Sequence, residues 1–235
     1  AIGSVLPKGH WYLEGTNCCL KSSITNDIGQ YLVDNKGAPK GYTGKIMADY
    51  TEFSKMQKFF KSKGHNEGRN LLYWGFFQHA TLVMEQQCSL DSECQFILQD
   101  RGVMSIWLYA CIFDLCEAGD DKDRCAKLWR EFLVELKWVK EKCPFTMFPA
   151  MNNQKVIILV DSDLDKWRHR CLTRRTPFDA MYMDSYGNNY HKWQHKVFAE
   201  VARAFGLGLF DLKSYGHDKD KVTEAIVHYM CEERA

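Results

Sequence analysis

The sequence has little proline, no excess of charge of either sign, and no long uninterrupted apolar run. Its 235 residues include only five prolines, and 31 basic side chains are balanced by 30 acidic ones. Low proline together with 46% hydrophobic residues excludes a disordered or fibrous chain. The balanced charge gives no electrostatic reason to expect nucleic acid or an anionic membrane as a partner. We therefore expect a folded globular protein that binds neither.

Two further absences bear on location. The longest apolar runs, such as 103–113, are interrupted and shorter than the roughly 20 residues that a bilayer-spanning helix needs. Residues 1–8 contain no basic segment followed by a long apolar one, so they do not resemble a secretory signal. These absences predict an intracellular protein.

Cysteine is abundant, but its spacing is not that of a metal site. None of the ten cysteines forms a C-x-x-C pair or a zinc-finger pattern with histidine, so no structural metal is expected. Cys111 and Cys116 lie in an apolar stretch and are expected to be small core side chains. Cys88 and Cys94 flank a polar turn, where an intramolecular or intermolecular disulfide could form.

Short apolar runs alternate with longer segments of helical periodicity. Strands are predicted at 10–13, 96–99, 156–160 and 207–212. Helices are predicted at 24–33, 47–61, 71–86, 103–116, 120–142, 163–175, 190–205 and 222–231. This alternation predicts one α/β domain over residues 1–235, with a mostly parallel sheet of about five strands covered by helices on both faces.

Residues 13–23 match a phosphate-binding loop at all but one position. The pattern G-x-x-x-x-G-K-[ST] is filled by Gly15, Lys21 and Ser22, whereas Leu20 stands in place of the second glycine. In such a loop, backbone N–H groups turn inward around the anion and need bare backbone at their closest approach. Leucine adds a bulky side chain there, and a positive φ at that position would cost it about 1–2 kcal/mol.

The order of the segments resembles that of the thymidylate kinase and deoxynucleoside kinase families. The loop Glu14-Gly15 … Lys21-Ser22-Ser23 is similar to the families' E-G-x-x-x-x-G-K-S-T, and 100–105 with Tyr109 is similar to their [DE]-R-x-x-x-S motif. The strand 156–160 is followed by arginines that resemble those of the families' lid, namely Arg168, Arg170, Arg174 and Arg175. The resemblance implies a three-layer P-loop kinase-like fold with a lid-like segment at about 168–190.

The resemblance also implies roles for individual residues. Gly15, Lys21, Ser22, Ser23 and the four lid arginines would bind the phosphates of ATP. Asp100 and Ser22 would hold Mg²⁺, and Arg101 would orient the acceptor. Two alternatives stand beside these roles: Asp100 could cap the helix that follows it, and the arginines could form a solvated face.

The loop that would contact the acceptor departs from the families' pattern. Residues 37–43 resemble the segment R-E-P-G-G-T, but Gly37 and Ala38 stand in place of its arginine and glutamate. Removing one preorganised contact commonly costs about 10²–10³ in rate, so departures in both loops predict a catalytically degenerate kinase fold. With a shifted alignment, Glu52 could supply the missing base.

Three functions follow from these observations. Near-zero net charge, abundant cysteine and aromatic residues (seven Trp, 11 Tyr and 14 Phe) favour a structural protein that assembles with itself, without a cofactor, as in the matrix of a viral occlusion body. Intermolecular disulfides and the tyrosines of 181–190 would support such contacts. The alternatives are an active nucleoside or nucleotide kinase that uses Mg²⁺ and ATP, and a soluble pseudoenzyme that binds nucleotide without turnover.

Overall fold

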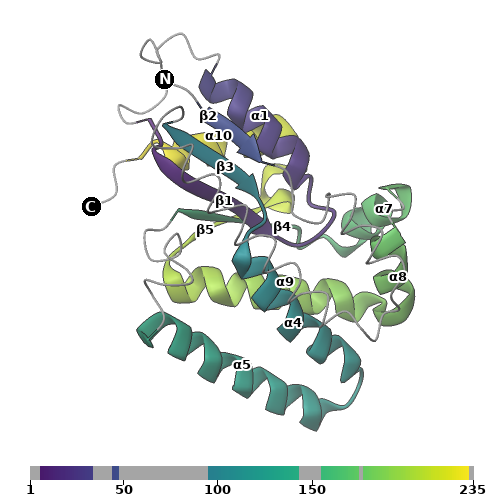
Figure 1. The fold of residues 1–235 in the computed structure, drawn as a ribbon. Helices are drawn as coiled ribbons and strands as arrows, with labels where there is room; N and C mark the ends of the chain where they lie inside the picture. The colour runs from purple at the N-terminus through teal and green to yellow at the C-terminus, as the bar shows by residue number, and fades with distance from the viewer. Residues whose placement is uncertain (1–5, 34–43, 48–94, 143–154, 175–176, 233–235) are drawn as a thin grey trace.

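A five-stranded parallel sheet forms the centre of the protein (Figure 1). The structure, a computed structural model, describes residues 6–33, 44–47, 95–142, 155–174 and 177–232. The strands are β1 (Gly9–Gly15), β2 (Gly44–Met47), β3 (Phe96–Asp100), β4 (Val156–Val160) and β5 (Gly208–Asp211). They lie in the order β2-β3-β1-β4-β5, and every neighbouring pair is parallel. The predicted α/β class and parallel sheet are confirmed.

The two strands that flank β1 are buried along their whole length. β3 and β4 consist mainly of aliphatic and aromatic residues, and all five residues of each strand are buried. Leu13 of β1 pairs in register with Ile157 of β4, and Trp11 pairs with Leu98 of β3. Such continuous apolar runs are typical of parallel strands covered on both faces, which is the reason that β4 was the clearest strand in the sequence.

One face of the sheet is covered by α1 (Lys21–Val33) and α10 (Lys219–Met230), which pack against each other (Figure 1). Ile24, Ile28 and Leu32 of α1 follow one another at intervals of four residues and have no exposed surface. This spacing places them on one side of the helix. The amphipathic pattern of the sequence therefore fixes which face of α1 meets the sheet.

The opposite face is covered by α4 (Val103–Glu117) and α9 (Asn188–Phe205), with α5 (Lys122–Lys142) packed outside them (Figure 1). α5 buries only one side, through Phe132, Leu136 and Val139. Helices therefore cover both faces of the sheet, which confirms the predicted layers.

The predicted lid-like segment 168–190 is helical. It comprises most of α7 (Leu164–Arg174), all of α8 (Pro177–Tyr186) and the start of α9. Its tyrosines Tyr182, Tyr186 and Tyr190 lie around Phe113 of α4, with ring centroids 4.6–6.4 Å from that of Phe113. Tyr190 is buried, whereas Tyr182 and Tyr186 are half-buried, so only these two keep surface for the predicted interface.

One strand was missed by the sequence reasoning. β2 occupies Gly44–Met47, directly after a stretch rich in glycine and lysine, and it ends at the residue where a helix was expected to begin. The predicted helices of 47–61 and 71–86 otherwise lie outside the described residues. Within the described ranges, no helix is both long enough and apolar enough to cross a membrane.

Candidate functional site: the phosphate loop and its surroundings

The loop that resembles a phosphate loop joins β1 to α1. Its first glycine, Gly15, has φ of 130°, and a Cβ at this position would lie 1.8 Å from the carbonyl oxygen of Leu159. The same oxygen accepts a 3.1 Å hydrogen bond from the backbone N–H of Thr16. Only glycine allows β1 to end this close to β4, so the backbone itself requires this residue.

The position of the missing glycine has a left-handed backbone. Leu20 has φ of 61°, and Cys18, two residues earlier, has φ of 53°. This conformation costs an L-residue about 1–2 kcal/mol. The side chain of Leu20 is partly buried and packs against the hydrophobic core. The loop thus has a backbone conformation that suits glycine at a position occupied by a leucine whose side chain packs against the core.

Polar groups of the loop itself fill its interior. The Lys21 side chain is buried, and its Nζ donates a hydrogen bond to the carbonyl oxygen of Thr16. The hydroxyl of Thr16 lies 2.5 Å from Sγ of Cys19. Burial raises the pKa of the Cys19 thiol to about 11, although the charge of Lys21 and the contact with Thr16 act in the opposite direction. The lysine expected to reach a phosphate therefore contacts its own loop.

Ser22 and Asp100, expected to hold Mg²⁺ together, do lie in contact. Oγ of Ser22 donates a 2.5 Å hydrogen bond to Oδ2 of Asp100, which is buried at the end of β3. Oδ1 of Asp100 is also buried and has no hydrogen-bond partner among the described residues. The alternative that Asp100 caps the next helix is wrong, since α4 has Gly102 at its N-cap and no side-chain cap.

Arg101 belongs to a buried network at the base of the loop. Its guanidinium donates to the carbonyl of Gly15 at 3.1 Å, to Oγ of Ser105 at 3.1 Å and to the hydroxyl of Tyr109 at 3.3 Å. Glu14 accepts hydrogen bonds from Oγ of Ser105 and, at 2.6 Å, from a backbone N–H of the turn after β3. The two motif residues Glu14 and Arg101 therefore join the ends of β1 and β3 to α4.

Two helices hold the loop from the other side. Oε1 of Gln194 in α9 accepts from the Tyr109 hydroxyl at 2.6 Å and from the backbone N–H of Asn17 at 2.9 Å. The indole N–H of Trp167 in α7 donates to the carbonyl of Asn17 at 3.0 Å. Both backbone polar groups of Asn17 are thus bonded to helices that come from distant parts of the sequence.

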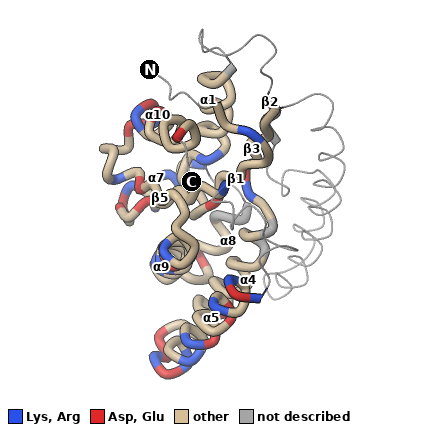
Figure 2. Tube along the Cα trace, turned by 90° about the vertical axis from the view of Figure 1, so that its left-hand side faces the viewer, with Lys and Arg blue, Asp and Glu red and all other residues tan. Residues whose placement is uncertain are grey.

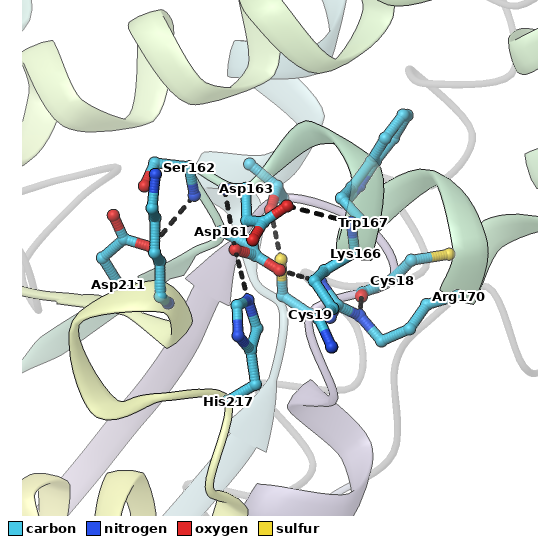
Figure 3. A network of polar contacts seen from close by, with 12 residues as sticks. Cys18, Cys19, Asp161, Ser162, Asp163, Lys166, Trp167, Arg170, Asp211 and His217 are labelled. Atoms are coloured by element: carbon cyan, nitrogen blue, oxygen red, sulfur yellow. Dashed lines mark hydrogen bonds and ion pairs between the residues drawn. The ribbon is translucent and has the colours of Figure 1, made fainter.

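One of the predicted lid arginines reaches the loop (Figure 3). Nε of Arg170 donates to the carbonyl of Cys18 at 2.7 Å, and its guanidinium forms an ion pair with Asp161. Asp161 is fully buried and also accepts from Nε2 of His217 at 3.1 Å. We call these four residues (Cys18, Asp161, Arg170 and His217) the Arg170 clasp. It connects the end of β4, α7 and the turn before α10 to the phosphate loop.

Other predicted site residues lie apart from the loop interior. Oγ of Ser23 accepts from Lys219 of α10 at 3.2 Å. Arg168 bonds to the side chain of Asn188, and Arg174 is exposed. Outside the described residues are Gly37, Ala38, Glu52, Cys88, Cys94 and Arg175. No disulfide joins two of the seven cysteines within the described ranges.

Sequence reasoning missed Asp161, the acidic member of the clasp. A signal was present, since Asp161 directly follows the apolar strand 156–160, and the carboxyl ends of parallel strands gather functional side chains. Arg170 was predicted as a site residue, but His217 was not, because it lies 56 positions from Asp161 and no local pattern links the two.

The two ends of the site differ in how well their residues suit a ligand. At the cation end, Ser22 and the unpaired Oδ1 of Asp100 are ligands of the kind that Mg²⁺ prefers, namely hydroxyl, carboxylate and water oxygens. At the phosphate end, Leu20 replaces the glycine, Lys21 contacts Thr16, and Arg170 is paired with Asp161. The residues present therefore fit the metal of a nucleotide complex better than its phosphates.

Comparisons with known proteins give a fold but no close relative. No protein-family model matches the chain, and no curated protein matches it significantly. Among solved structures it is similar to a deoxyadenosine kinase from M. mycoides with bound dATP, with a TM-score of 0.53 and 12% sequence identity. The match covers 96% of this chain and 100% of that chain. At this identity the likeness shows the fold alone, and the expected P-loop kinase-like fold is confirmed.

Proposed function

We propose that this chain is a kinase-fold protein that no longer transfers phosphate and that serves a structural, self-assembling role. The observation that carries the proposal is that the residues expected to bind phosphate are replaced or are bonded to other groups of the protein. Leu20 replaces the glycine, the Lys21 amine donates to Thr16, and Arg170 is held by Asp161 and Cys18. The side chains that would contact the phosphates of a nucleotide therefore bond to groups of the protein itself.

Opening this loop for phosphates has a cost. Freeing Arg170 would leave Asp161, which has no exposed side-chain surface, without its charged partner. Breaking a buried ion pair in this way costs about 3–5 kcal/mol. The leucine would also have to move aside, and the lysine would have to exchange its bond to Thr16. The cost of rearranging the loop would therefore offset much of the favourable free energy of nucleotide binding.

Self-assembly is the role that fits the rest of the chain. A net charge of +1 provides little repulsion between copies. Large apolar side chains are exposed on several described elements, namely Tyr31, Val134, Trp138, Leu172 and Leu209. The matrix of a viral occlusion body is one assembly of this kind.

One observation favours a second candidate, an active nucleoside or nucleotide kinase that uses Mg²⁺ and ATP. Ser22 and Asp100 keep the contact that the family resemblance implies, and Oδ1 of Asp100 has no hydrogen-bond partner among the described residues. A soluble pseudoenzyme that binds nucleotide without turnover would use the same pair.

Two measurements on the purified chain separate these roles. Light scattering over a range of concentrations should show a mass that rises with concentration. A coupled assay for ADP release from Mg-ATP, with nucleosides and thymidine monophosphate as acceptors, should show no acceptor-dependent turnover. A monomeric chain with turnover that Lys21→Ala abolishes would replace this proposal by the kinase.

A further inference from the structure

The outer side of α5 carries a regular stripe of exposed side chains. Lys127, Glu131, Val134, Trp138 and Glu141 follow one another at intervals of four, three, four and three residues, and all are exposed. This spacing is that of a helix seam that packs against a second helix. The buried side of the same helix faces α4 and α9, and α5 is the outermost helix in Figure 1.

The middle of the stripe is apolar. Val134 is 70% exposed and Trp138 is 56% exposed. They line a shallow open hollow together with Arg130, Glu131 and Glu135, and most of its accessible wall is apolar. Tryptophan is enriched at the energetic centres of protein interfaces, so an exposed tryptophan beside an exposed valine is a suitable centre for a contact.

We infer that this face of α5 binds the same face of a second copy of the chain, with the two helices antiparallel and a two-fold axis at Val134. In that arrangement Val134 contacts Val134 of the partner subunit. Trp138, four residues after the axis, lies opposite Arg130 of the partner subunit, four residues before it. An arginine over an indole ring is a favourable cation–π contact. Val134 at the centre of the face, and Arg130 and Trp138 on either side of it, therefore complement the same residues of the second copy.

The charges along the stripe agree with the same axis. Lys127 and Glu141 are each seven residues from Val134, and Glu131 and Lys137 are each three residues from it. An antiparallel pair thus sets every one of these charges opposite the other sign. Within one chain, Lys127 already lies 3.8 Å from Glu131, and Lys137 lies 3.8 Å from Glu141. Two copies would join these pairs into clusters of four alternating charges.

The same pattern disfavours other arrangements and partners. A parallel pair would set Lys127 against Lys127 and Glu131 against Glu131, which is repulsive. The face carries three basic residues (Lys127, Arg130 and Lys137) and three acidic ones (Glu131, Glu135 and Glu141), and both signs alternate along α5 in Figure 2. A nucleic acid or an anionic membrane would need a face of one sign.

This inference rests on the proposed self-assembly and names one of its contacts. A single helix pair is smaller than most stable interfaces, so we expect a dissociation constant on the order of 10–100 µM for this contact alone. Repeated within an assembly, weak contacts of this kind add together.

Sedimentation velocity over a concentration series tests the inference. Val134→Glu places two carboxylates at the axis and should weaken association by tenfold or more. The matched control is Ala180→Glu, which also replaces an exposed apolar residue by glutamate, on α8, and should leave association unchanged. Circular dichroism would verify that both variants are folded.

A charge exchange gives a second, independent test. A chain with Lys127→Glu and Lys137→Glu has an acidic stripe, and a chain with Glu131→Lys and Glu141→Lys has a basic one. Each should fail to pair with itself, and a mixture of the two should associate.

The outcomes separate the inference from the proposed function. Association of the natural chain that neither Val134→Glu nor the charge exchange alters would overturn the α5 contact and leave self-assembly standing. A natural chain that stays monomeric up to the highest concentration would overturn both.

Discussion

Arg170 and Asp161 form an ion pair that ties α7 to the end of β4 beside the phosphate loop. The aspartate side chain has no exposed surface, and that of the arginine is 20% exposed. Nε of the same guanidinium donates to the carbonyl of Cys18. Arg170, which the sequence predicts as a phosphate-binding arginine, is thus held by a carboxylate and a loop carbonyl.

The first prediction concerns this pair. Asp161→Asn leaves Arg170 without a counter-charge and should lower the free energy of unfolding by about 2–4 kcal/mol, somewhat below the range for a fully buried pair because the arginine is partly exposed. Urea denaturation measures the loss. Arg203→Gln, which removes the exposed pair with Glu200, is the control and should cost less than about 1 kcal/mol. Equal losses in both variants would show that the clasp is not a stabilising element.

The second prediction concerns the start of the loop. Gly15→Ala would place a Cβ 1.8 Å from the carbonyl oxygen of Leu159, at a residue with φ of 130°, and should cost at least about 3 kcal/mol. Gly119→Ala is the control, because Gly119 also has positive φ but no atom within 4 Å of the added Cβ. It should cost only the backbone strain of about 1 kcal/mol. Thermal unfolding compares the two, and a Gly15→Ala chain as stable as the control would mean that β1 does not end against β4.

The third prediction concerns pH. Burial lowers the pKa of His10 from 6.5, while its hydrogen bond to Gln99 acts in the opposite direction. The unfolded chain therefore binds more protons than the folded one as pH falls through 6.5, so the neutral histidine's contribution to stability is present above this pH and is lost below it.

His10→Gln should accordingly reduce the difference in unfolding free energy between pH 7.5 and pH 5. Guanidinium denaturation at several pH values measures this slope. An unchanged slope in His10→Gln would show that this histidine titrates alike in both states.

Local patterns were enough to predict much of the sheet and one end of the site. The apolar run of β4 and the pairing of Ser22 with Asp100 were both expected, because each depends on a motif and on the order of strands. The loop between a strand and a helix was predicted at Gly15 to Lys21, and Leu20 does have the positive φ that is costly for leucine.

Features that depend on tertiary contacts could not be predicted in the same way. β2 has four residues, which are too few to show the alternation of apolar and polar side chains that identifies a strand. Tyr182, Tyr186 and Tyr190 were expected at an interface, but their rings pack around Phe113 of α4. The Arg170 clasp joins residues up to 199 positions apart, from Cys18 to His217, and no local pattern contains it.

The fourth prediction is the central one, and calorimetric titration of the natural chain with Mg-ATP into the millimolar range tests it most directly. A closed phosphate end predicts no saturable heat of binding. Leu20→Gly, which restores bare backbone at the closest approach, should raise the affinity. Saturable binding by the natural chain that Lys21→Ala abolishes would contradict the account, because it would mean that the loop still receives phosphates beside Leu20.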